Sequence, residues 1–206
     1  MPRLYANVAI GEGAVIADDA VIGLPPRGAG DGERAVIIGP DATIRSGTVI
    51  YGGVTIGSAF NSGHGALIRE DNIIGDHCSV GSNAMLEPHN VIGNYTRIHS
   101  GCFLERVTLG NHVFVGPNVT FTDDPHPPCV DCTETIGGAI LEDGVSVGGN
   151  ATLMPGVRIG AGSLIGGGSV VTKSFGPGVV IAGNPARVLK ATSDVKCRVT
   201  GKPHGQ

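Results

Sequence analysis

Aliphatic residues return at every sixth position over most of the chain. Between residues 145 and 184 glycine often follows them, a small or β-branched residue often stands four positions on, and the aliphatic residues themselves are Val147, Leu153, Ile159, Ile165 and Val171. A fixed period of this kind is typical of repeat proteins. Six residues cannot bury an apolar face alone, so successive turns must stack into a solenoid with a continuous core.

The same period begins near the N-terminus and is interrupted twice. Two segments rich in turn-forming and polar residues, 24–35 and 122–138, break it and predict loops that leave the solenoid. One residue is missing from the period before Leu109, and the period ends at Ile181. We expect a solenoid domain over residues 1–181 and a tail over residues 182–206, in which a short helix can start at Pro185, a favourable residue for a first helical turn.

Composition agrees with a solenoid and excludes several protein classes. The chain has 35 glycines, no tryptophan and 4% aromatic residues, which suits a core of stacked small aliphatic side chains. A net charge of −4 without a basic run argues against nucleic-acid binding. No apolar run reaches the roughly 18 residues of a membrane span, and no leader is visible at the N-terminus, so we expect a cytoplasmic protein. Five scattered cysteines argue against a secreted disulfide framework.

The repeat and the terminal segments VTKSF and GVVIAGNPARVLK resemble the hexapeptide-repeat acyltransferases. The resemblance covers nearly the whole chain. It implies an all-β, left-handed parallel β-helix with three hexads per coil and about eight coils. It also implies acetyl-CoA as cosubstrate and a homotrimer with active sites between subunits.

Three further segments narrow the resemblance. They are GHGALIRED (63–71), the region of Glu105 and VFVGPNVTFTDDPHP (113–127), which are similar to the branch that N-acetylates amino sugars on nucleotide carriers. That branch implies a role in cell-surface polysaccharide biosynthesis.

Acyl transfer from a thioester needs a group that takes a proton from the nucleophile, and histidine is the usual one. His64 sits where the repeat lapses, between two glycines, and should stack with Ser82 and Ser100. It is either a general base, a sugar-binding residue or a solvent-facing corner. His126 competes with it, because a loop histidine at a comparable place is the base in the galactoside and antibiotic acetyltransferases. Asn83 can brace the oxyanion or accept from the amine.

Charged residues recur at the coil spacing near these histidines. Arg69, Glu87 and Glu105 are 18 residues apart, which predicts either a stabilising column or carboxylates that hold sugar hydroxyls beside His64 and His99. His99 replaces a glycine of neighbouring repeats, so it either binds substrate or caps a corner. In the second loop, Asp123 and Asp124 can accept from pantetheine amides, orient His126 or form turns.

Other side chains fit structural roles at the same spacing. We expect a surface column of His77, Tyr95 and His112, an ion pair between Asp71 and His89, an internal amide ladder of Asn72 and Asn90, and inert core thiols at Cys78 and Cys102.

The candidate cofactor residues lie in the C-terminal third. The exposed backbone at Gly148 and Gly166 can approach pantetheine, although corner geometry also explains glycine there. Phosphates suit the cationic side chains of Lys173, Arg187 and Lys190. The turn at Asn184 and Pro185 resembles the one that closes over the cofactor in the family.

A structural zinc ion is a further expectation. Cys129 and Cys132 form a CxxC pair that can bind zinc together with Cys197 and with His126 or His204, since zinc needs four ligands.

These features predict an acetyl-CoA-dependent N-acetyltransferase of a nucleotide-linked amino sugar, working by direct attack of the amine on the thioester. The alternatives are an O-acetyltransferase of a small hydroxyl compound, a metal-dependent hydratase of the γ-carbonic-anhydrase kind and a catalytically silent scaffold. The hydratase fits poorly, because its zinc histidines lie close in sequence and no two histidines here are nearer than ten residues.

Overall fold

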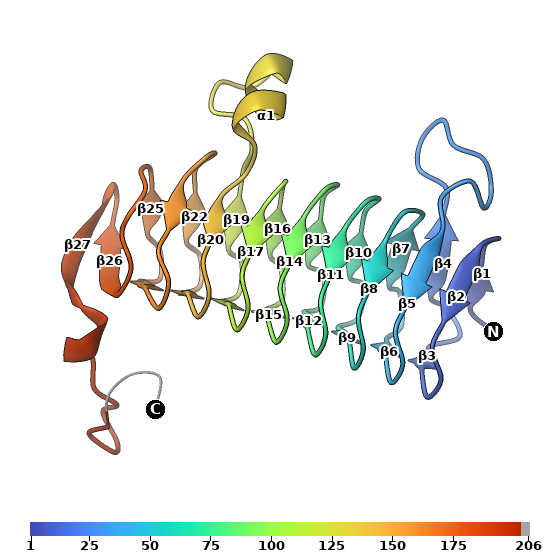
Figure 1. Ribbon diagram of the computed structural model, residues 1–206, viewed down its shortest axis with the longest axis horizontal. Helices are drawn as coiled ribbons and strands as arrows, with labels where there is room; N and C mark the ends of the chain where they lie inside the picture. The colour runs from blue at the N-terminus through green and yellow to red at the C-terminus, as the bar shows by residue number, and fades with distance from the viewer. Residues whose placement is uncertain (203–206) are drawn as a thin grey trace.

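A computed structural model describes residues 1–202 as a three-sided prism of stacked coils (Figure 1). Each side is a parallel sheet, and the chain visits sheets A, B and C in turn. Sheet A has nine strands, so the prism has nearly nine coils, one more than predicted. The described residues include no helix that is long and apolar enough to cross a membrane.

The strands of sheet A, in spatial order, are β1 (Arg3–Leu4), β4 (Val21–Leu24), β7 (Val49–Tyr51), β10 (Leu67–Ile68), β13 (Met85–Leu86), β16 (Phe103–Leu104), β19 (Thr120–Phe121), β22 (Thr152–Leu153) and β25 (Val170–Val171). Those of sheet B are β2 (Val8–Ile10), β5 (Val36–Ile38), β8 (Thr55–Ile56), β11 (Ile73–Ile74), β14 (Val91–Ile92), β17 (Thr108–Leu109), β20 (Ile140–Leu141) and β23 (Arg158–Ile159). Those of sheet C are β3 (Val15–Ile16), β6 (Thr43–Ile44), β9 (Asn61–Ser62), β12 (Ser79–Val80), β15 (Arg97–Ile98), β18 (Phe114–Val115), β21 (Ser146–Val147), β24 (Leu164–Ile165), β26 (Val179–Gly183) and β27 (Ala186–Ala191).

The six-residue period produces this stacking. The second residue of most short strands points inward and is buried, as at Ile68, Leu86 and Leu104, which lie one above another in sheet A. Between strands the chain turns a corner through a residue in the left-handed region, where Gly, Asn and Asp are favoured. The missing residue is confirmed, because Ile92 pairs with Leu109 rather than with a residue 18 positions on.

Both predicted loops leave the prism along one edge, where the chain passes from sheet A to sheet B (Figure 1). The first joins β4 to β5 and the second joins β19 to β20. The second loop contains a helix that the sequence pattern did not predict, α1 (Val130–Ile136). We call this corner line the A–B edge, and the one between sheets C and A the C–A edge.

The helix predicted at Pro185 is wrong. Residues 186–191 form β27, which pairs antiparallel with β26, and a short 3-10 turn, Thr192–Asp194, follows. The pairing satisfies backbone groups at the end of sheet C, which a helix would leave as an open edge. Gly183, with a φ of 103°, makes the tight reversal between the two strands.

Candidate functional site

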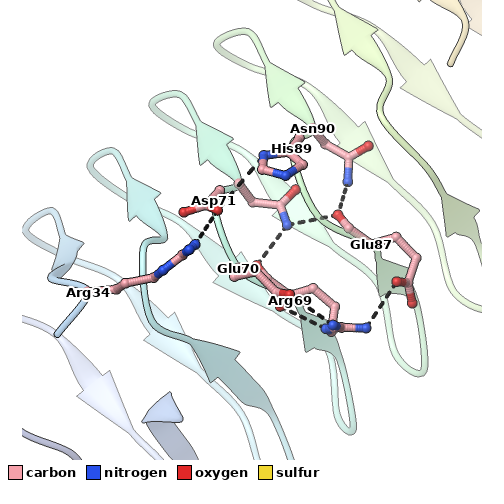
Figure 2. Close-up of polar contacts among 8 residues, drawn as sticks. Arg34, Arg69, Glu70, Asp71, Glu87, His89 and Asn90 are labelled. Atoms are coloured by element: carbon pink, nitrogen blue, oxygen red, sulfur yellow. Dashed lines mark hydrogen bonds and ion pairs between the residues drawn. The ribbon is translucent and has the colours of Figure 1, made fainter. Parts of the chain in front are cut away.

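Charged side chains form a continuous ridge along the A–B edge, between the two loops. Arg69 donates from Nε and Nη2 to Glu70, at 2.8 and 2.9 Å, and from Nη1 to Glu87 at 3.1 Å (Figure 2). The predicted contact between Arg69 and Glu87 is therefore confirmed, whereas Glu105 faces Asp123 instead. We call this set of corner residues the A–B ridge; it comprises Arg34, Arg69, Glu70, Asp71, Glu87, His89, Glu105, Arg106 and Asp123.

The first loop is tied to the ridge by a charge pair. Arg34 donates from Nη1 to Asp71 Oδ2, and Nδ1 of His89 lies 3.9 Å from the same oxygen (Figure 2). The expected pairing of Asp71 with His89 is confirmed. Arg34 was not among the predicted site residues, since the loop spacing says nothing about where its side chain returns.

Beneath the ridge, Asn72 and Asn90 lie inside the coil as predicted, but their side chains bond to backbone groups and not to each other, so the predicted amide ladder is not formed. Both are fully buried, and both donate from Nδ2 to the carbonyl oxygen of Glu87. These bonds hold the backbone of the corner that presents Glu87 to the ridge.

A cavity of about 330 Å³ lies between the ridge and α1. Carboxyl groups dominate its lining, which consists of Arg34, Glu70, Asp71, Glu87, Pro88, His89, Glu105, Arg106, Asp123 and Thr133. Arg106 Nε lies 3.4 Å from Asp123 Oδ2. Burial, and then the neighbouring Asp123 carboxylate, raise the pKa of Glu105 to about 7. The cavity can therefore accept a cationic, hydroxyl-rich ligand and also exchange a proton near neutral pH.

Asp124 organises the second loop rather than the cavity. Its two carboxylate oxygens accept the backbone N–H groups of His126 and Cys129, at 2.8 and 2.6 Å. The thiols of Cys129 and Cys132 are 2.7 Å apart, and His126 Nδ1 lies 3.9 Å from Cys132 Sγ. Of the predicted roles for Asp124, loop formation is the one this geometry fits.

The predicted zinc cluster of Cys129, Cys132 and Cys197 is not formed. Within residues 1–202 no three metal-binding side chains come together. Cys197 belongs to the tail beyond β27, on the other side of the prism from α1, and its thiol accepts the N–H of Thr200 (Figure 1). His204 lies outside the described residues. Cys78 and Cys102 are buried, and burial raises the pKa of both thiols, as expected for inert core residues.

His64 and Asn83 lie on a different corner line, the C–A edge. The N–H of His64 donates to Ser82 Oγ at 3.0 Å, which confirms the predicted stacking, and its carbonyl accepts the N–H of Asn83. Because sheet A separates this edge from the ridge, the expectation that Glu87 and Glu105 lie beside His64 in one protomer is wrong. The repeat correctly predicts which residues stack in successive coils, but it does not predict which corners of one coil lie close together.

The outer surface of sheet C carries two adjoining hollows. His99 packs on Phe114 at 4.8 Å between ring centroids, and the Arg97 guanidinium lies 6.0 Å from the Phe114 ring. His99 lines a pocket of about 230 Å³ with Asn61, Ser79 and Ser100. Phe114 opens the next one, a groove of about 420 Å³ lined also by Ser146, Val147, Gly148, Leu164, Ile165, Gly166 and Gly167. The two predicted cofactor glycines, Gly148 and Gly166, thus share one groove.

The remaining cofactor candidates lie at the C-terminal end of the prism. Lys173 follows β25, with its amine 5.6 Å from the Phe175 ring centroid. Asn184 and Pro185 form the β26–β27 turn, and Arg187 and Lys190 are exposed on β27. None of the five lines the groove, so a role for them requires the cofactor to extend beyond it.

Sequence reasoning missed Glu70 and Arg106 as members of the ridge. A signal was available, because Arg106 follows Glu105 and occupies the same left-handed corner position as Asp71 and His89. Charged residues that recur at this corner position line the A–B edge.

Comparisons with known proteins agree with the repeat. A family model described as bacterial transferase hexapeptide (six repeats) matches residues 138–173. A curated 2,3,4,5-tetrahydropyridine-2,6-dicarboxylate N-acetyltransferase of Staphylococcus aureus (strain bovine RF122 / ET3-1) is 36% identical over 89 residues, which is 43% of this chain and 35% of that protein. The chain thus spans about a third of the length of that relative.

Solved structures extend the likeness. A hexapeptide-repeat acetyltransferase of Vibrio cholerae O1 biovar eltor, complexed with acetyl-CoA, has a TM-score of 0.50 and 28% identity over 57% of this chain and 69% of its own. The polySia-specific acetyltransferase NeuO shows the same fold over 92% of this chain and 80% of its own, with a TM-score of 0.51 and 21% identity. In its repeat and its fold the chain is similar to the hexapeptide-repeat acyltransferases, whose coil is a left-handed parallel β-helix.

Proposed function

We propose that the protein is an acetyl-CoA-dependent N-acetyltransferase that acts on an amino sugar, carried by a nucleotide. The observation that carries the acceptor class is the cavity of the A–B ridge, where Glu87, Glu105 and Asp123 face one space. Carboxylates accept hydrogen bonds from sugar hydroxyls and attract an ammonium group. Acetyl-CoA and nucleotide sugars are cytoplasmic metabolites, so we place the reaction in the cytoplasm.

The acetyl-CoA part rests on the groove of sheet C and on the family. Gly148, Gly166 and Gly167 line the groove without side chains and so leave room for an extended pantetheine arm, and Phe114 and Leu164 offer apolar contacts. The Vibrio cholerae relative, which binds acetyl-CoA, supports the same cosubstrate here.

We further propose a homotrimer with the active site shared between copies. The outward side chains of sheet A are largely apolar: Val21, Val49, Leu67, Met85 and Phe103. Packing sheet A around a threefold axis would bury this stripe. It would also set the C–A edge of one copy against the A–B edge of the next, so that His64 and Asn83 approach a neighbouring ridge.

In that arrangement the amine attacks the thioester carbonyl directly. In this proposal His64, or His126 from the second loop, accepts a proton, and Asn83 or a backbone amide donates to the developing oxyanion. No covalent acyl-enzyme is needed, because the amine of the acceptor is itself the nucleophile.

The test is a thiol-release assay with acetyl-CoA and paired acceptors. The pairs are UDP-glucosamine with UDP-glucose, and dTDP- and GDP-linked amino sugars with their hydroxyl counterparts; maltose, serine and tetrahydrodipicolinate extend the panel. Release of CoA with an amino sugar, and an amide product by mass spectrometry, is the expected result. Turnover only with hydroxyl acceptors would identify an O-acetyltransferase, and no turnover with any acceptor would overturn the proposal.

A further inference from the structure

Five carboxyl groups line the A–B cavity, and four of them, those of Glu70, Asp71, Glu87 and Asp123, have a cationic neighbour. Glu87 accepts from Arg69 at 3.1 Å, and Asp123 lies 3.4 Å from Arg106. Across residues 1–202, no Arg, Lys or His forms an ion pair with Glu105. Glu105 is thus the carboxyl group of this cavity that is left for a cation from outside.

The position of Glu105 suits a bound ammonium group. It lies between Glu87, one coil before it, and Asp123, at the start of the second loop, and all three line the same cavity. A cation at Glu105 would be attracted by this carboxyl group and by its acidic neighbours, whereas a hydroxyl group would gain a hydrogen bond without the attraction between opposite charges.

We propose that Glu105 binds the ammonium group of the acceptor and takes a proton from it, as the general base of the reaction. This inference rests on the proposed N-acetyltransferase activity and names the acceptor class and the base of that same site. In this assignment Glu105 replaces His64 and His126, neither of which lines the cavity of its own protomer, as the group that takes this proton.

The electrostatics support this assignment. The pKa of Glu105 is raised to about 7, first by burial and then by the Asp123 and Glu87 carboxylates. The other charged groups of the cavity are Glu70, Asp71, Arg34, Arg106 and the titratable His89, with Arg69 behind Glu87. A base whose pKa is near the working pH accepts a proton without holding it too tightly.

The step balances within the ternary complex. The Glu105 carboxylate takes one proton from the ammonium group and becomes a carboxylic acid, which leaves a neutral amine. The amine lone pair forms the C–N bond to the thioester carbonyl carbon, and collapse of the tetrahedral intermediate breaks the C–S bond. The second amine proton passes to the departing thiolate, which leaves as CoA-SH, and Glu105 returns its proton to solvent.

The test measures amine preference by calorimetry without acetyl-CoA, at pH 7.5. The probes are UDP-glucosamine and UDP-glucose, which differ by an amine in place of a hydroxyl group. Wild type should bind the amine at least about tenfold more tightly, as expected for a charge-assisted contact. Glu105→Gln, which keeps the shape and a polar tip, should bind the two equally, and the control Glu12→Gln, an exposed carboxylate on the first coil, should match wild type.

Retained amine preference in E105Q, or no preference in wild type, would overturn the inference. A pH profile adds a readout that a purely structural role would not move: Asp123→Asn removes a neighbouring negative charge, so the acidic limb of kcat/KM should move to lower pH. Because binding is measured without acetyl-CoA, the two proposals fail separately. Amine preference without transfer overturns only the proposed function, and transfer without amine preference overturns only this inference.

Discussion

Val107 donates its backbone N–H to Oδ1 of Asn90, one coil earlier, at 2.9 Å. The bond lies where the coil is one residue short. The side-chain oxygen of Asn90 therefore accepts a backbone N–H, whereas the equivalent oxygen of Asn72 has no such donor. Oδ1 of Asn72 has no partner, although its Nδ2 donates to the carbonyls of Arg69 and Glu87. The shortened corner between β16 and β17, which presents Glu105, is therefore held by Asn90.

Replacing the two amides should show this difference. Asn90→Leu leaves the buried Val107 N–H without an acceptor, whereas Asn72→Leu removes only donors to two carbonyls. We expect Asn90→Leu to lower the free energy of unfolding by about 1 to 3 kcal/mol more than Asn72→Leu does. Urea denaturation followed by circular dichroism measures both, and equal losses would show that the Val107 bond adds nothing.

Repeat spacing predicted the solenoid because one physical requirement, burial of an aliphatic side chain every six residues, recurs along the chain. It also predicted the stacked rings of His77, Tyr95 and His112, whose centroids lie 4.7 and 4.9 Å apart with nearly parallel planes. Such columns follow from register alone.

What spacing could not predict depends on where the repeat stops. After the shortened coil, Phe103 pairs with Thr120, so Thr122 rather than Asp123 occupies the place one coil beyond Glu105. Asp123 reaches Glu105 only because the second loop begins there. Likewise, β27 forms because β26 ends sheet C with an open edge, which is a property of the folded stack and not of residues 185–190 themselves.

The raised pKa of Glu105 makes stability depend on pH. Its folded pKa of about 7 exceeds the ordinary value of 4.5, so the folded state holds a proton that the unfolded state releases between these values. Stability associated with Glu105 is therefore full below about pH 4.5 and is lost as pH rises through 7. Relative to E105Q, the free energy of unfolding of wild type should fall by on the order of 1 kcal/mol between pH 5 and 8. The change is this small because the partial exposure of Glu105 weakens the effect.

Thermal melts of wild type and E105Q across this pH range provide the measurement, with E12Q as the matched control. The Tm of wild type should fall relative to the Tm of E105Q as pH rises, while the Tm of E12Q should follow that of wild type. A constant gap would mean that Glu105 titrates normally in the folded protein.

A charge on the outer surface of sheet A should prevent assembly. Leu67 points outward from β10, in the middle of the apolar stripe, so Leu67→Glu would bury a carboxylate in the proposed trimer contact. We expect the mass by light scattering to fall from trimer to monomer, with transferase activity lost and the circular dichroism spectrum unchanged.

The matched control is Thr55→Glu, on the exposed surface of sheet B in a neighbouring coil. It should leave the trimer intact. A monomeric wild type, or a trimeric Leu67→Glu variant, would remove sheet A as the contact surface.

Filling the sheet C groove should weaken acetyl-CoA binding without affecting the acceptor cavity. Ser146 lies in the groove beside Phe114, its register partner on β18, so Ser146→Trp would occupy the space between Phe114 and Leu164. We expect the Kd for acetyl-CoA to rise at least about tenfold, the loss of roughly 1.4 kcal/mol of contact. Ser79→Trp, on the same sheet but in the adjoining pocket of His99, is the matched control and should leave this Kd unchanged. If Ser79→Trp weakens acetyl-CoA binding and Ser146→Trp does not, the cosubstrate lies along the His99 pocket, and the glycines at 148 and 166 serve the corners of the coil alone.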